Sequence, residues 1–566
     1  MSSHTHKVEI MDKFNEIKSR NDLAKFLKIP IKKLTYMLYV KKIDYYYDSF
    51  EIPKKNGDVR LINAPKGDLK ELQRKLTDAL WVAQKEFMKN EKKCANISHG
   101  FEKKKGIITN AKIHRNKRFV LNLDFEDFFD SFHFGRVRGY FVKNRNFQLP
   151  IEVATIIAQL TCYNGKLPQG APSSPIVTNL ICNILDIRLV KIAKKFKVDY
   201  TRYADDLTFS TNDKYFIENQ VGFYKEIKKE VEGFGLAIND KKTRLSYKDS
   251  RQEVTGLIVN KKLSVKREYC KYTRTMADYL YKYGEFKIDG VEGTIKQLEG
   301  RFTYIDQLDH YNNKLDDKNH NFWNLNSREK QYRKFLFYKY FFANSKPLVV
   351  TEGKTDIVYL RAALKNNYED YPSLIEKNGD KYTYKISFLR RTSRLRYFLN
   401  ISLDGADTMK NIYNFFIGKN QFPNYLKYFM DKSNSMPKNP VVLVFDNEQK
   451  SKRPLREFLG YIKLKKNESL NGKLHLNIEK NLYLLTNPLV KGKSECEIED
   501  LFEDSVLSNK IDGKSFSKEN KFDINKYYGK SDFSRHVSSN YKKINFSNFK
   551  PMLYELEKIV KEYDKF

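Results

Sequence analysis

The chain has 566 residues with 105 Lys or Arg against 70 Asp or Glu, a formal net charge of +35 at pH 7. This length exceeds one ordinary domain and predicts two to four. The positive excess favours a polyanionic partner, nucleic acid before a membrane surface, and no apolar run could span a bilayer. A polar N-terminus and five scattered cysteines predict a cytoplasmic protein with reduced thiols, and exclude a structural zinc site built on C-x-x-C pairs.

Helices surrounding one hairpin are predicted for the first ninety residues. Apolar spacing within 8–45 is helical, and Asn21-Asp22 resembles a helix start. Residues 50–62 alternate around an Asn-Gly pair, which predicts a β-hairpin with a basic tip. A longer helix is expected from about 67 to 89. A basic tip above an active site would hold a triphosphate, whereas alone it indicates only a solvated hairpin.

The next segment predicts a strand that ends in a carboxylate. Residues 119–124 are apolar and finish at Asp124, a position suited to catalysis or to capping a helix. Residues 167–175 are rich in Pro and Gly and lead into an apolar helix at 176–190. Gly170 permits close approach of the main chain to a ligand.

A second hairpin is predicted around Tyr-Ala-Asp-Asp at 203–206, because both flanks are β-branched or aromatic with polar alternation. Adjacent carboxylates at such a turn repel one another and are costly to bury, and a divalent cation would stabilise them. Hard oxygen ligands suit Mg²⁺. An acidic β-turn is the alternative.

The second half of the chain begins at a composition break near 341–347. Apolar strands are predicted at 348–351, 386–388, 441–445 and 482–485, with helices between them. This alternation predicts an α/β domain with a parallel sheet. Glu352 follows the first of these strands. The last sixty residues predict a tail or a small helical cap.

The first half resembles the reverse transcriptases across residues 50–265. The strand aspartate Asp124, Leu-Pro-Gln-Gly at 167–170, Tyr-Ala-Asp-Asp at 203–206 and Asn-x-x-Lys-Thr at 239–243 occur in that family's order. The resemblance implies an α+β right-hand polymerase with fingers, palm and thumb. It also implies RNA-directed DNA synthesis from deoxynucleotides with two Mg²⁺ ions in the polymerase site.

The resemblance also implies roles for single residues. Asp124, Asp205 and Asp206 would be catalytic metal ligands, together with the main chain of Phe125. Lys242 would protonate the pyrophosphate or stabilise its charge. Phe129 would exclude a ribose 2′-hydroxyl, and the other substrate contacts would come from a basic hairpin and the Gln-Gly pair. These contacts are Arg60, either Lys54 or Lys55, Gln169 and Gly170.

Two shorter segments resemble those that distinguish bacterial retron reverse transcriptases. They are Asn110-Ala111-x-x-His114 and Val254-Thr255-Gly256. The resemblance implies a structured non-coding RNA as partner, priming from a guanosine 2′-hydroxyl, and a branched RNA–DNA product. Asn110, His114, Val254, Thr255 and Gly256 would contact that RNA, with the basic aromatic helices that follow. Group II intron enzymes are the nearest alternative, but neither a maturase segment nor a Cys/His-rich endonuclease is evident.

A second acidic set resembles the TOPRIM domain. Glu352 follows one strand, and Asp446-x-Glu448 follows another. Asp356 and Glu499 resemble additional acids of TOPRIM nucleases of the overcoming-lysogenization-defect type. The resemblance implies Mg²⁺ or Mn²⁺ and cleavage of a nucleic-acid target. Glu448 departs from the family's Asp, and a generic α/β domain with capped strand ends is the alternative.

The predicted organisation is therefore a retron reverse transcriptase at 1–340, a TOPRIM domain at 346–505 and an extension at 506–566. Within the first, fingers and palm cover about 1–250, and the thumb and RNA-binding region about 251–340. Such a fusion resembles a retron architecture of bacterial antiphage defence, in which the branched product restrains the toxic domain. A homo-oligomer is compatible with this reading. The alternatives are a non-catalytic RNA-packaging module and a purely structural C-terminal half.

Overall fold

In the computed structural model, the chain divides after Lys266 into two units, Met1–Lys266 and Arg267–Phe566. The structure describes residues 14, 16–53, 57–90, 97–316, 319–402, 407–450, 452–462, 470, 472–490, 492–519 and 521–563. Lys54 and Lys55, one of which was predicted to contact the triphosphate, lie outside the described residues. Among the described residues, no helix is both long enough and apolar enough to cross a lipid bilayer.

The elements of the first unit follow the predicted order. They are α2 (Arg20–Phe26), α3 (Ile31–Thr35), η1 (Tyr36–Val40), η2 (Ile43–Tyr46), β1 (Tyr47–Pro53), β2 (Val59–Pro65), α4 (Gly67–Asn90), α5 (Ile107–Ala111), η3 (Lys112–His114), β3 (Phe119–Asp124), α6 (Phe134–Lys143), α7 (Ile151–Thr161), α8 (Ser174–Lys195), β4 (Asp199–Tyr203), β5 (Asp206–Thr211), α9 (Phe216–Gly233), η4 (Asp240–Lys242), β6 (Arg244–Tyr247), β7 (Glu253–Val254) and β8 (Leu257–Ile258).

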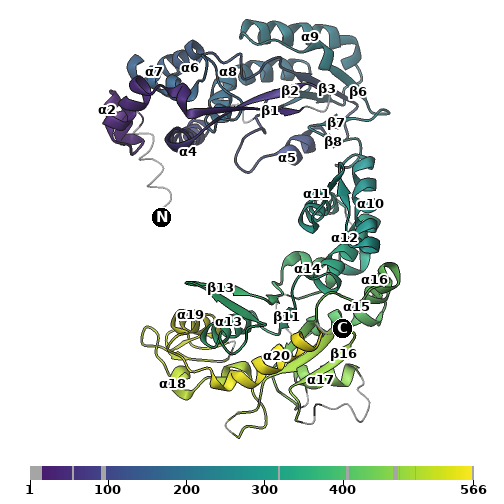
Figure 1. Ribbon diagram of the computed structural model, residues 1–566. Coiled ribbons are helices and arrows are strands. Elements are labelled where there is room, and N and C mark those ends of the chain that lie inside the picture. The colour runs from purple at the N-terminus through teal and green to yellow at the C-terminus, as the bar shows by residue number, and fades with distance from the viewer. Residues whose placement is uncertain are drawn as a thin grey trace. The chain divides into compact units, whose positions relative to one another are not determined.

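An antiparallel sheet in the order β4-β5-β3-β6 carries the first unit, and helix α8 packs against β4 and α9 (Figure 1). Strands β1 and β2 form the predicted hairpin as a separate antiparallel pair. One apolar cluster joins the sheet to the helices, and it includes Leu123, Leu207 and Phe209. Burial of such side chains contributes about 1.5–3 kcal/mol each, so this core fixes the ends of β3 and β5.

The start of α2 differs from the prediction by two residues. Ser19, rather than Asn21, caps the helix, with its hydroxyl accepting from the main-chain N–H of Asp22 at 3.3 Å. The Asp22 carboxylate in turn accepts from the main-chain N–H of Ser19 at 3.0 Å. This capping box satisfies two main-chain N–H groups at the start of the helix. Asp22 is thus the third residue after the cap, and not part of the cap itself.

The second unit consists of a helical segment followed by an α/β segment. Its elements are α10 (Arg267–Tyr283), β9 (Lys287–Ile288), β10 (Val291–Glu292), α11 (Ile295–Asn313), η5 (Phe322–Asn324), α12 (Ser327–Phe337), η6 (Tyr338–Phe342), β11 (Leu348–Thr351), α13 (Asp356–Asn366), β12 (Ile375–Asn378), β13 (Lys381–Tyr384), β14 (Ser387–Phe388), α14 (Ser393–Leu399), α15 (Asp407–Ile417), α16 (Tyr425–Ser433), β15 (Val441–Phe445), α17 (Pro454–Ile462), β16 (His475–Glu479), β17 (Leu482–Thr486), η7 (Ile498–Leu501), α18 (Asp504–Leu507), β18 (Ser515–Phe516), β19 (Tyr527–Tyr528), α19 (Lys530–Asn540), η8 (Ser547–Phe549) and α20 (Lys550–Tyr563).

A five-stranded sheet in the order β14-β11-β15-β17-β16 organises this unit. The first four strands run parallel and β16 is antiparallel at one edge. Strand side chains alternate between two apolar cores, with Val350 and Leu443 in one core and Val349 and Val442 in the other. The predicted α/β segment is therefore present, and every predicted strand lies in the sheet.

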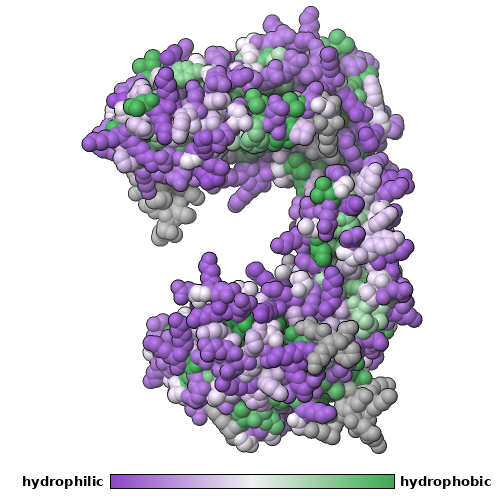
Figure 2. Space-filling model, viewed as in Figure 1, coloured by the Kyte–Doolittle hydropathy of each residue, from purple (hydrophilic) through white to green (hydrophobic). Residues whose placement is uncertain are grey.

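The helices before residue 342 share a core with this sheet. Ala277 of α10 and Phe335 of α12 belong to the same apolar cluster as Val350 and Leu443. We predicted the domain boundary near 340–346, but the two units divide at Lys266 because this shared core joins the helices to the α/β segment. The surface seen in Figure 2 is largely hydrophilic on each unit, as the high content of charged residues leads one to expect.

Candidate active site

Three predicted carboxylates meet at one end of the β3–β5 pair. Asp124, the last residue of β3, lies opposite Asp206, the first residue of β5. Asp205 occupies the turn between β4 and β5, and its carbonyl oxygen accepts from the main-chain N–H of Phe125 at 3.1 Å. The antiparallel register thus brings together residues separated by about eighty positions in the sequence. Asp-Asp at the hairpin and Asp at the strand end form one acidic centre.

This centre is electrostatically strained. Burial, and after it the neighbouring carboxylates of Asp205 and Asp124, raise the pKa of Asp206 to about 7. Burial likewise raises the pKa of Asp205, with Asp124 adding to the effect. Ionising these groups together is unfavourable unless a positive charge compensates them. Perturbed carboxylates of this kind concentrate at functional sites.

Lys242 supplies one positive charge. Its Nζ donates to Asp124 Oδ1 at 2.7 Å, and this hydrogen bond raises the pKa of the lysine. Asn239 sets the position of the turn η4 that carries Lys242. The main-chain N–H of Asn239 donates to the Asp124 carbonyl at 2.8 Å, and its side-chain oxygen accepts from the main-chain N–H of Lys242 at 3.3 Å. The Asn-x-x-Lys-Thr spacing therefore places the lysine against the acidic centre.

A buried ion pair holds the Asp-Asp turn from behind. Arg202 is fully buried, and its Nη2 donates to Asp186 Oδ2 at 2.8 Å while its Nε donates to Oδ1 at 2.9 Å. Arg202 Nη1 also donates to the carbonyl of Ala204 at 3.2 Å. Ala204 adopts a left-handed conformation with φ +56°, which is strained for a residue with a Cβ. The guanidinium thus fixes the one residue between Tyr203 and the two aspartates.

Sequence reasoning missed Arg202 and Asp186. A lone aspartate within the apolar helix α8 and an arginine at an inward position of β4 were the available signals, because such charges are buried only as pairs. Gly100 completes the enclosure of the turn. A Cβ at Gly100 would overlap the main-chain nitrogen of Ala204, so only glycine fits there.

Asn110 and His114 are fully buried, although they were predicted to contact RNA. His114 bridges the hairpin, with Nδ1 2.7 Å from Ser210 Oγ on β5 and Nε2 2.7 Å from Thr201 Oγ1 on β4. Burial lowers the pKa of His114 to about 3, so the ring is neutral. Side chains without exposed surface cannot touch RNA directly. His114 acts here as a cross-link between the strands that carry the aspartates.

The Val-Thr-Gly segment forms the tight turn between β7 and β8. Val254 is buried, Thr255 has φ +46° and Gly256 has φ +83°. Gly256 is exposed, whereas the Thr255 hydroxyl has no hydrogen-bond partner among the described residues. Helix α5, which carries Asn110, packs against both strands of this turn. The two predicted RNA-contacting segments are therefore neighbours, and of the Val-Thr-Gly turn only Gly256 is exposed.

The predicted substrate residues lie around the hairpin β1–β2 and the segment after β3. The main-chain N–H of Asn63 on β2 donates to the Gln169 carbonyl at 2.8 Å. Gly170 has φ +116°, and a Cβ there would lie 2.7 Å from the Ile62 side chain. The glycine is thus required for packing of this turn on β2. Arg60 is exposed and lowers the pKa of Asp205 by its charge.

Phe129, five residues after Asp124 in the chain, belongs to an aromatic group. Its ring is half-buried, 5.4 Å from the Phe128 ring and 6.3 Å from the Phe101 ring. Phe101 follows Gly100, whose main chain abuts Ala204. A tilted contact with Phe101 and an edge-to-face contact with Phe128 hold Phe129 in place. Its predicted role against the ribose stays a prediction.

The second acidic set lies where the parallel strands of the second unit end. The main-chain N–H of Asp446, after β15, donates to Glu352 Oε1, after β11, at 3.1 Å. Asp446 Oδ1 accepts from Asn487 Nδ2 at 2.7 Å and from the main-chain N–H of Ile498 at 2.8 Å. Asp356 begins α13 and accepts from the main-chain N–H of Gly353 at 2.8 Å.

Burial and mutual repulsion perturb these carboxyls as well. Burial, with smaller contributions from Asp356 and Glu448, raises the pKa of Glu352 to about 7. Burial raises the pKa of Asp446 far above its usual range, with contributions from Glu352, Asp356 and Glu499. The predicted acids Glu352, Asp356, Asp446, Glu448 and Glu499 therefore interact as one cluster. Glu448 also pairs with Arg453, whose Nη1 lies 3.3 Å from its Oε1.

Lys530 of the C-terminal segment reaches this cluster, which the sequence did not indicate. Its Nζ donates to the buried Glu499 at 3.1 Å and lies 3.4 Å from Glu497. These carboxylates raise the pKa of the lysine against the opposing effect of burial. Among the described residues, no three Asp, Glu, His or Cys side chains gather closely enough to hold a metal ion. The metal-binding roles in both units stay predictions.

Comparison with known proteins addresses the family. A family model described as "Reverse transcriptase (RNA-dependent DNA polymerase)" matches residues 52–273. The retron Ec86 reverse transcriptase of Escherichia coli is 32% identical over 300 residues, which cover 51% of this chain and 89% of that protein. The chain belongs to the retron reverse transcriptase family.

Other retron enzymes match over shorter shares of their length. The retron Mx65 reverse transcriptase of Myxococcus xanthus is 34% identical over 46% of this chain and 61% of its own length. The retron Mx162 enzyme of the same organism is 32% identical over 52% of this chain and 64% of its own. Among solved structures, telomerase from Candida albicans with a telomeric RNA fragment matches 51% of this chain and 58% of its own. The match has a TM-score of 0.30 and 12% sequence identity, so no conclusion is drawn from it.

Family membership confirms the predicted retron reverse transcriptase and its RNA-directed DNA polymerase activity. The matched residues 52–273 contain Asp124, Asp205, Asp206 and Lys242. Retron reverse transcriptases work with a non-coding RNA template and nucleotides, and reverse transcriptases use divalent metal ions such as Mg²⁺.

Proposed function

We propose that Asp124, Asp205 and Asp206 bind two Mg²⁺ ions and catalyse DNA synthesis on RNA. The observation that carries this proposal is the opposition of Asp124 to Asp206 at the sheet end, with Asp205 between the strands. Carboxylate oxygens are the ligands that Mg²⁺ prefers, and the raised pKa values of Asp205 and Asp206 indicate a centre that needs positive charge. The chemistry of these donors therefore suits Mg²⁺, and the three side chains would have to draw closer together to hold it, because no three such groups gather closely enough in the described residues.

Metal ions bound there would activate the primer hydroxyl and neutralise the triphosphate. The chain's own residues do the rest. The Arg202 guanidinium holds the Ala204 carbonyl and so orients the aspartates that follow. Lys242 contacts Asp124 but is 61% exposed, so its ammonium can move from the carboxylate to the departing pyrophosphate. Arg60 would hold the triphosphate, and Gln169 with Gly170 and Phe129 would position the deoxynucleotide.

We further propose that the RNA partner is a structured non-coding RNA, copied into branched multicopy single-stranded DNA from a 2′-hydroxyl. Family membership supports this proposal, and so does the exposure of Gly256 in the turn between β7 and β8. Asn110 and His114 would act through the strands and helix they support instead of by contact. The biological role would be antiphage defence.

The second acidic cluster would be a metal-dependent nuclease of the TOPRIM type. Glu352 and Asp446 follow adjacent parallel strands, and Asp356, Glu448 and Glu499 surround them. Ligand sites of open parallel sheets lie at the carboxyl ends of strands, which supports a catalytic reading. Mg²⁺ or Mn²⁺ held by these acids would supply the Lewis acid for phosphodiester cleavage.

Polymerase function is tested by extension assays on the purified chain with its cognate RNA, Mg²⁺ and deoxynucleotides. Asp205→Asn/Asp206→Asn should abolish DNA synthesis, whereas Asp199→Asn at the far end of the same hairpin should retain it. Equal synthesis by the double variant and the wild type would sink the assignment. If the double variant loses DNA synthesis but keeps full phage protection and full RNA affinity, the non-catalytic RNA-packaging alternative is favoured.

The nuclease is tested after the branched product has been removed from the chain. Wild type should cleave an RNA or DNA species with Mg²⁺ or Mn²⁺, and Glu352→Gln should not. Glu369→Gln, an exposed carboxylate on the same unit, is the matched control. If the wild type cleaves no RNA or DNA species, and Glu352→Gln still gives full protection against phage, the C-terminal half is purely structural.

A further inference from the structure

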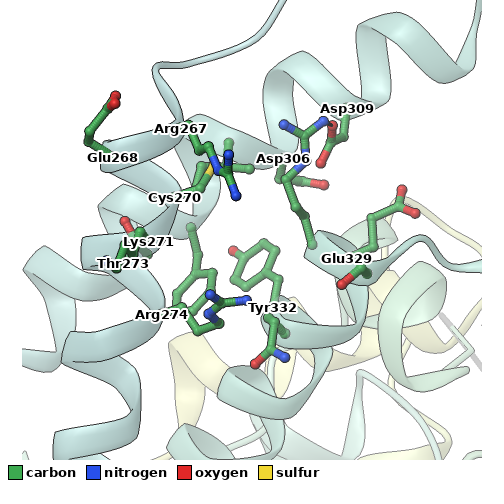
Figure 3. A pocket seen from close by; sticks show the side chains of 15 residues that line it. Arg267, Glu268, Cys270, Lys271, Thr273, Arg274, Asp306, Asp309, Glu329 and Tyr332 are labelled. Atoms are coloured by element: carbon green, nitrogen blue, oxygen red, sulfur yellow. Dashed lines mark hydrogen bonds and ion pairs between the residues drawn. The ribbon is translucent and has the colours of Figure 1, made fainter.

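Two aromatic side chains of this protein differ in whether they can meet another group. Tyr332 lies among the side chains around a cavity of about 560 Å³ in the second unit (Figure 3). Only 2% of Tyr332 is exposed, and its ring stacks on that of Phe302. Phe101 of the first unit is instead 43% exposed. Single exposed apolar side chains are common on protein surfaces, so the setting of Phe101 decides what its exposure means.

The main chain at Phe101 is strained and firmly held. Its φ is +60°, in the left-handed region where the Cβ of an ordinary residue is crowded. Gly100 lies so close to the catalytic turn at 203–206 that a Cβ there would overlap the main-chain nitrogen of Ala204. The buried Asn179 donates through Nδ2 to the Gly100 carbonyl at 3.0 Å and to Glu102 Oε1 at 3.3 Å. Both neighbours of Phe101 are therefore fixed, and residues held in strain in this way cluster at functional sites.

The Phe101 ring contacts the side chain that is expected to face the sugar of the nucleotide. Its centroid lies 6.3 Å from that of Phe129, with the planes tilted by 55°. Phe129 also meets Phe128 edge to face, with centroids 5.4 Å apart, and Phe128 is buried and stacks on Phe125. The half-buried Phe129 ring is thus held by the core through Phe128 and by the exposed ring of Phe101. Without Phe101, the Phe129 ring would lose one of these two contacts and could move more freely.

We propose that Phe101 is a positioning residue for sugar selection, which holds the Phe129 ring where it excludes a ribose 2′-hydroxyl. This proposal rests on the proposed role of Phe129. A ribonucleotide differs from a deoxynucleotide at that position by one oxygen atom, so a ring that can move aside excludes it poorly. Phe101 gives rigid support, because its main chain is anchored on the catalytic turn through Gly100. The same turn would then position both the catalytic aspartates and the ring that selects the sugar.

Sugar selection is measured with the full chain by addition of one nucleotide to a DNA primer on an RNA template. The readout is kcat/KM for a deoxynucleotide divided by kcat/KM for the matching ribonucleotide. Phe101→Ala should lower this ratio by about tenfold, because ribonucleotide is accepted more readily while deoxynucleotide use changes by about twofold at most. A purely structural role would instead lower both values together. Phe101→Tyr keeps the ring and should keep the wild-type ratio.

Two further variants separate loss of the ring from loss of folding. Phe101→Asn lacks the ring but suits a left-handed main chain, so it should fold and still show the lowered ratio. Tyr247→Ala is the matched control, because Tyr247 is 46% exposed and contacts Phe119 at the opposite end of β3 from Asp124. Its ratio should stay within about twofold of the wild type. Circular dichroism checks that each variant is folded.

A double-mutant cycle shows whether Phe101 acts through Phe129. Phe129→Ala should lower the ratio by about a hundredfold, and adding Phe101→Ala should lower it no further, since the supported ring is gone. An unchanged ratio in Phe129→Ala would refute the proposed role of Phe129 itself. A lowered ratio in Phe129→Ala with wild-type ratios in Phe101→Ala and Phe101→Asn would overturn only the support by Phe101. Additive losses in the double variant would show that Phe101 acts independently of Phe129 and would also overturn the positioning role.

Discussion

Lys242 and Asp124 form an ion pair with Nζ 2.7 Å from Oδ1, although 118 positions separate them in the sequence. The carboxylate is 14% exposed and the ammonium 61%, so the lysine can leave while the carboxylate stays. A divalent cation bound by Asp124 would compete with this lysine for the same oxygen. Metal binding to Asp124 would therefore release the Lys242 ammonium, which is proposed to assist departure of the pyrophosphate.

Replacing the lysine separates these two roles. Lys242→Met should bind Mn²⁺ more tightly than wild type, by about threefold, because the competing ammonium is gone. Its DNA synthesis should nevertheless fall by about tenfold or more, since the pyrophosphate loses its charge partner. Mn²⁺ affinity is measured by electron paramagnetic resonance and synthesis by single-turnover extension. Lys241→Met, at the exposed neighbouring position, should change neither, and weaker Mn²⁺ binding by Lys242→Met would contradict the competition.

The buried pair behind the catalytic turn predicts a loss of both stability and activity. Arg202→Lys keeps the charge but loses the forked contact to Asp186, so unfolding should become easier by about 3 kcal/mol. The apolar pair Arg202→Met/Asp186→Leu should recover most of this stability, because no buried charge is left alone. It should not recover synthesis, since the Ala204 carbonyl still lacks its donor.

Denaturant unfolding and extension rates, measured on the same preparations, distinguish these effects. Full activity in the apolar double variant would show that Arg202 serves stability alone. Asp213→Asn, a substitution two residues beyond the opposite end of β5, provides a control for general effects of charge removal near the hairpin.

The sequence was sufficient to predict features that depend on a local pattern of residues or on the order of motifs along the chain. Asp124 was found because an apolar strand ends in a carboxylate, and the parallel sheet because apolar runs alternate with helices. Register was not available, yet it is the register that sets Asp124 opposite Asp206. The two aspartates were assigned to one centre only because the order of motifs resembles a known family.

Burial and long-range pairing lay beyond the sequence. His114 was predicted to touch RNA because a histidine in a short polar motif gives no sign that strands will enclose it. The partners Arg202 and Asp186 lie 16 positions apart, one on a strand and one on a helix. The sequence pattern of each element predicts which of its faces is buried, but not which residue of the other element it meets. The boundary near 340–346 was placed at a change of composition, but a core shared across it decides where the units divide.

His114 predicts a dependence of stability on pH. Its pKa is about 3 when folded and about 6.5 when unfolded, so the unfolded chain binds the extra proton between these values. The free energy of unfolding therefore decreases as pH falls below 6.5, and the contribution of His114 is fully present above that pH. Between pH 7 and pH 5 the loss should be about 2 kcal/mol.

Urea unfolding of wild type and His114→Gln at both pH values isolates this contribution. The variant should be less stable at pH 7, because a bridge between β4 and β5 is weakened, but its stability should change less with pH. His133→Gln, at an exposed position of the same unit, should keep the wild-type slope. Equal slopes in wild type and His114→Gln would show that the ring is not held neutral by the fold.

The last prediction concerns the C-terminal segment, whose described residues between 506 and 563 are part of the second unit's core and do not form a tail. Phe533 of α19 and Leu556 of α20 belong to the apolar cluster that contains Val442 and Val349 of the sheet. Truncation after residue 505 would expose this face of β11 and β15, and the second unit should fail to fold. Limited proteolysis should then degrade it from Arg267 onward, while the first unit stays resistant.

The milder change Lys530→Met tests the charge that this segment supplies. Glu499 is 1% exposed on its side chain, so removal of its partner leaves a buried carboxylate and should cost about 3–5 kcal/mol. Adding Glu499→Gln should restore much of the stability, whereas Lys530→Met/Glu369→Gln, which neutralises an exposed carboxylate, should not. Recovery is read from denaturant unfolding of the second unit, and equal recovery in both double variants would refute the pairing as the cause.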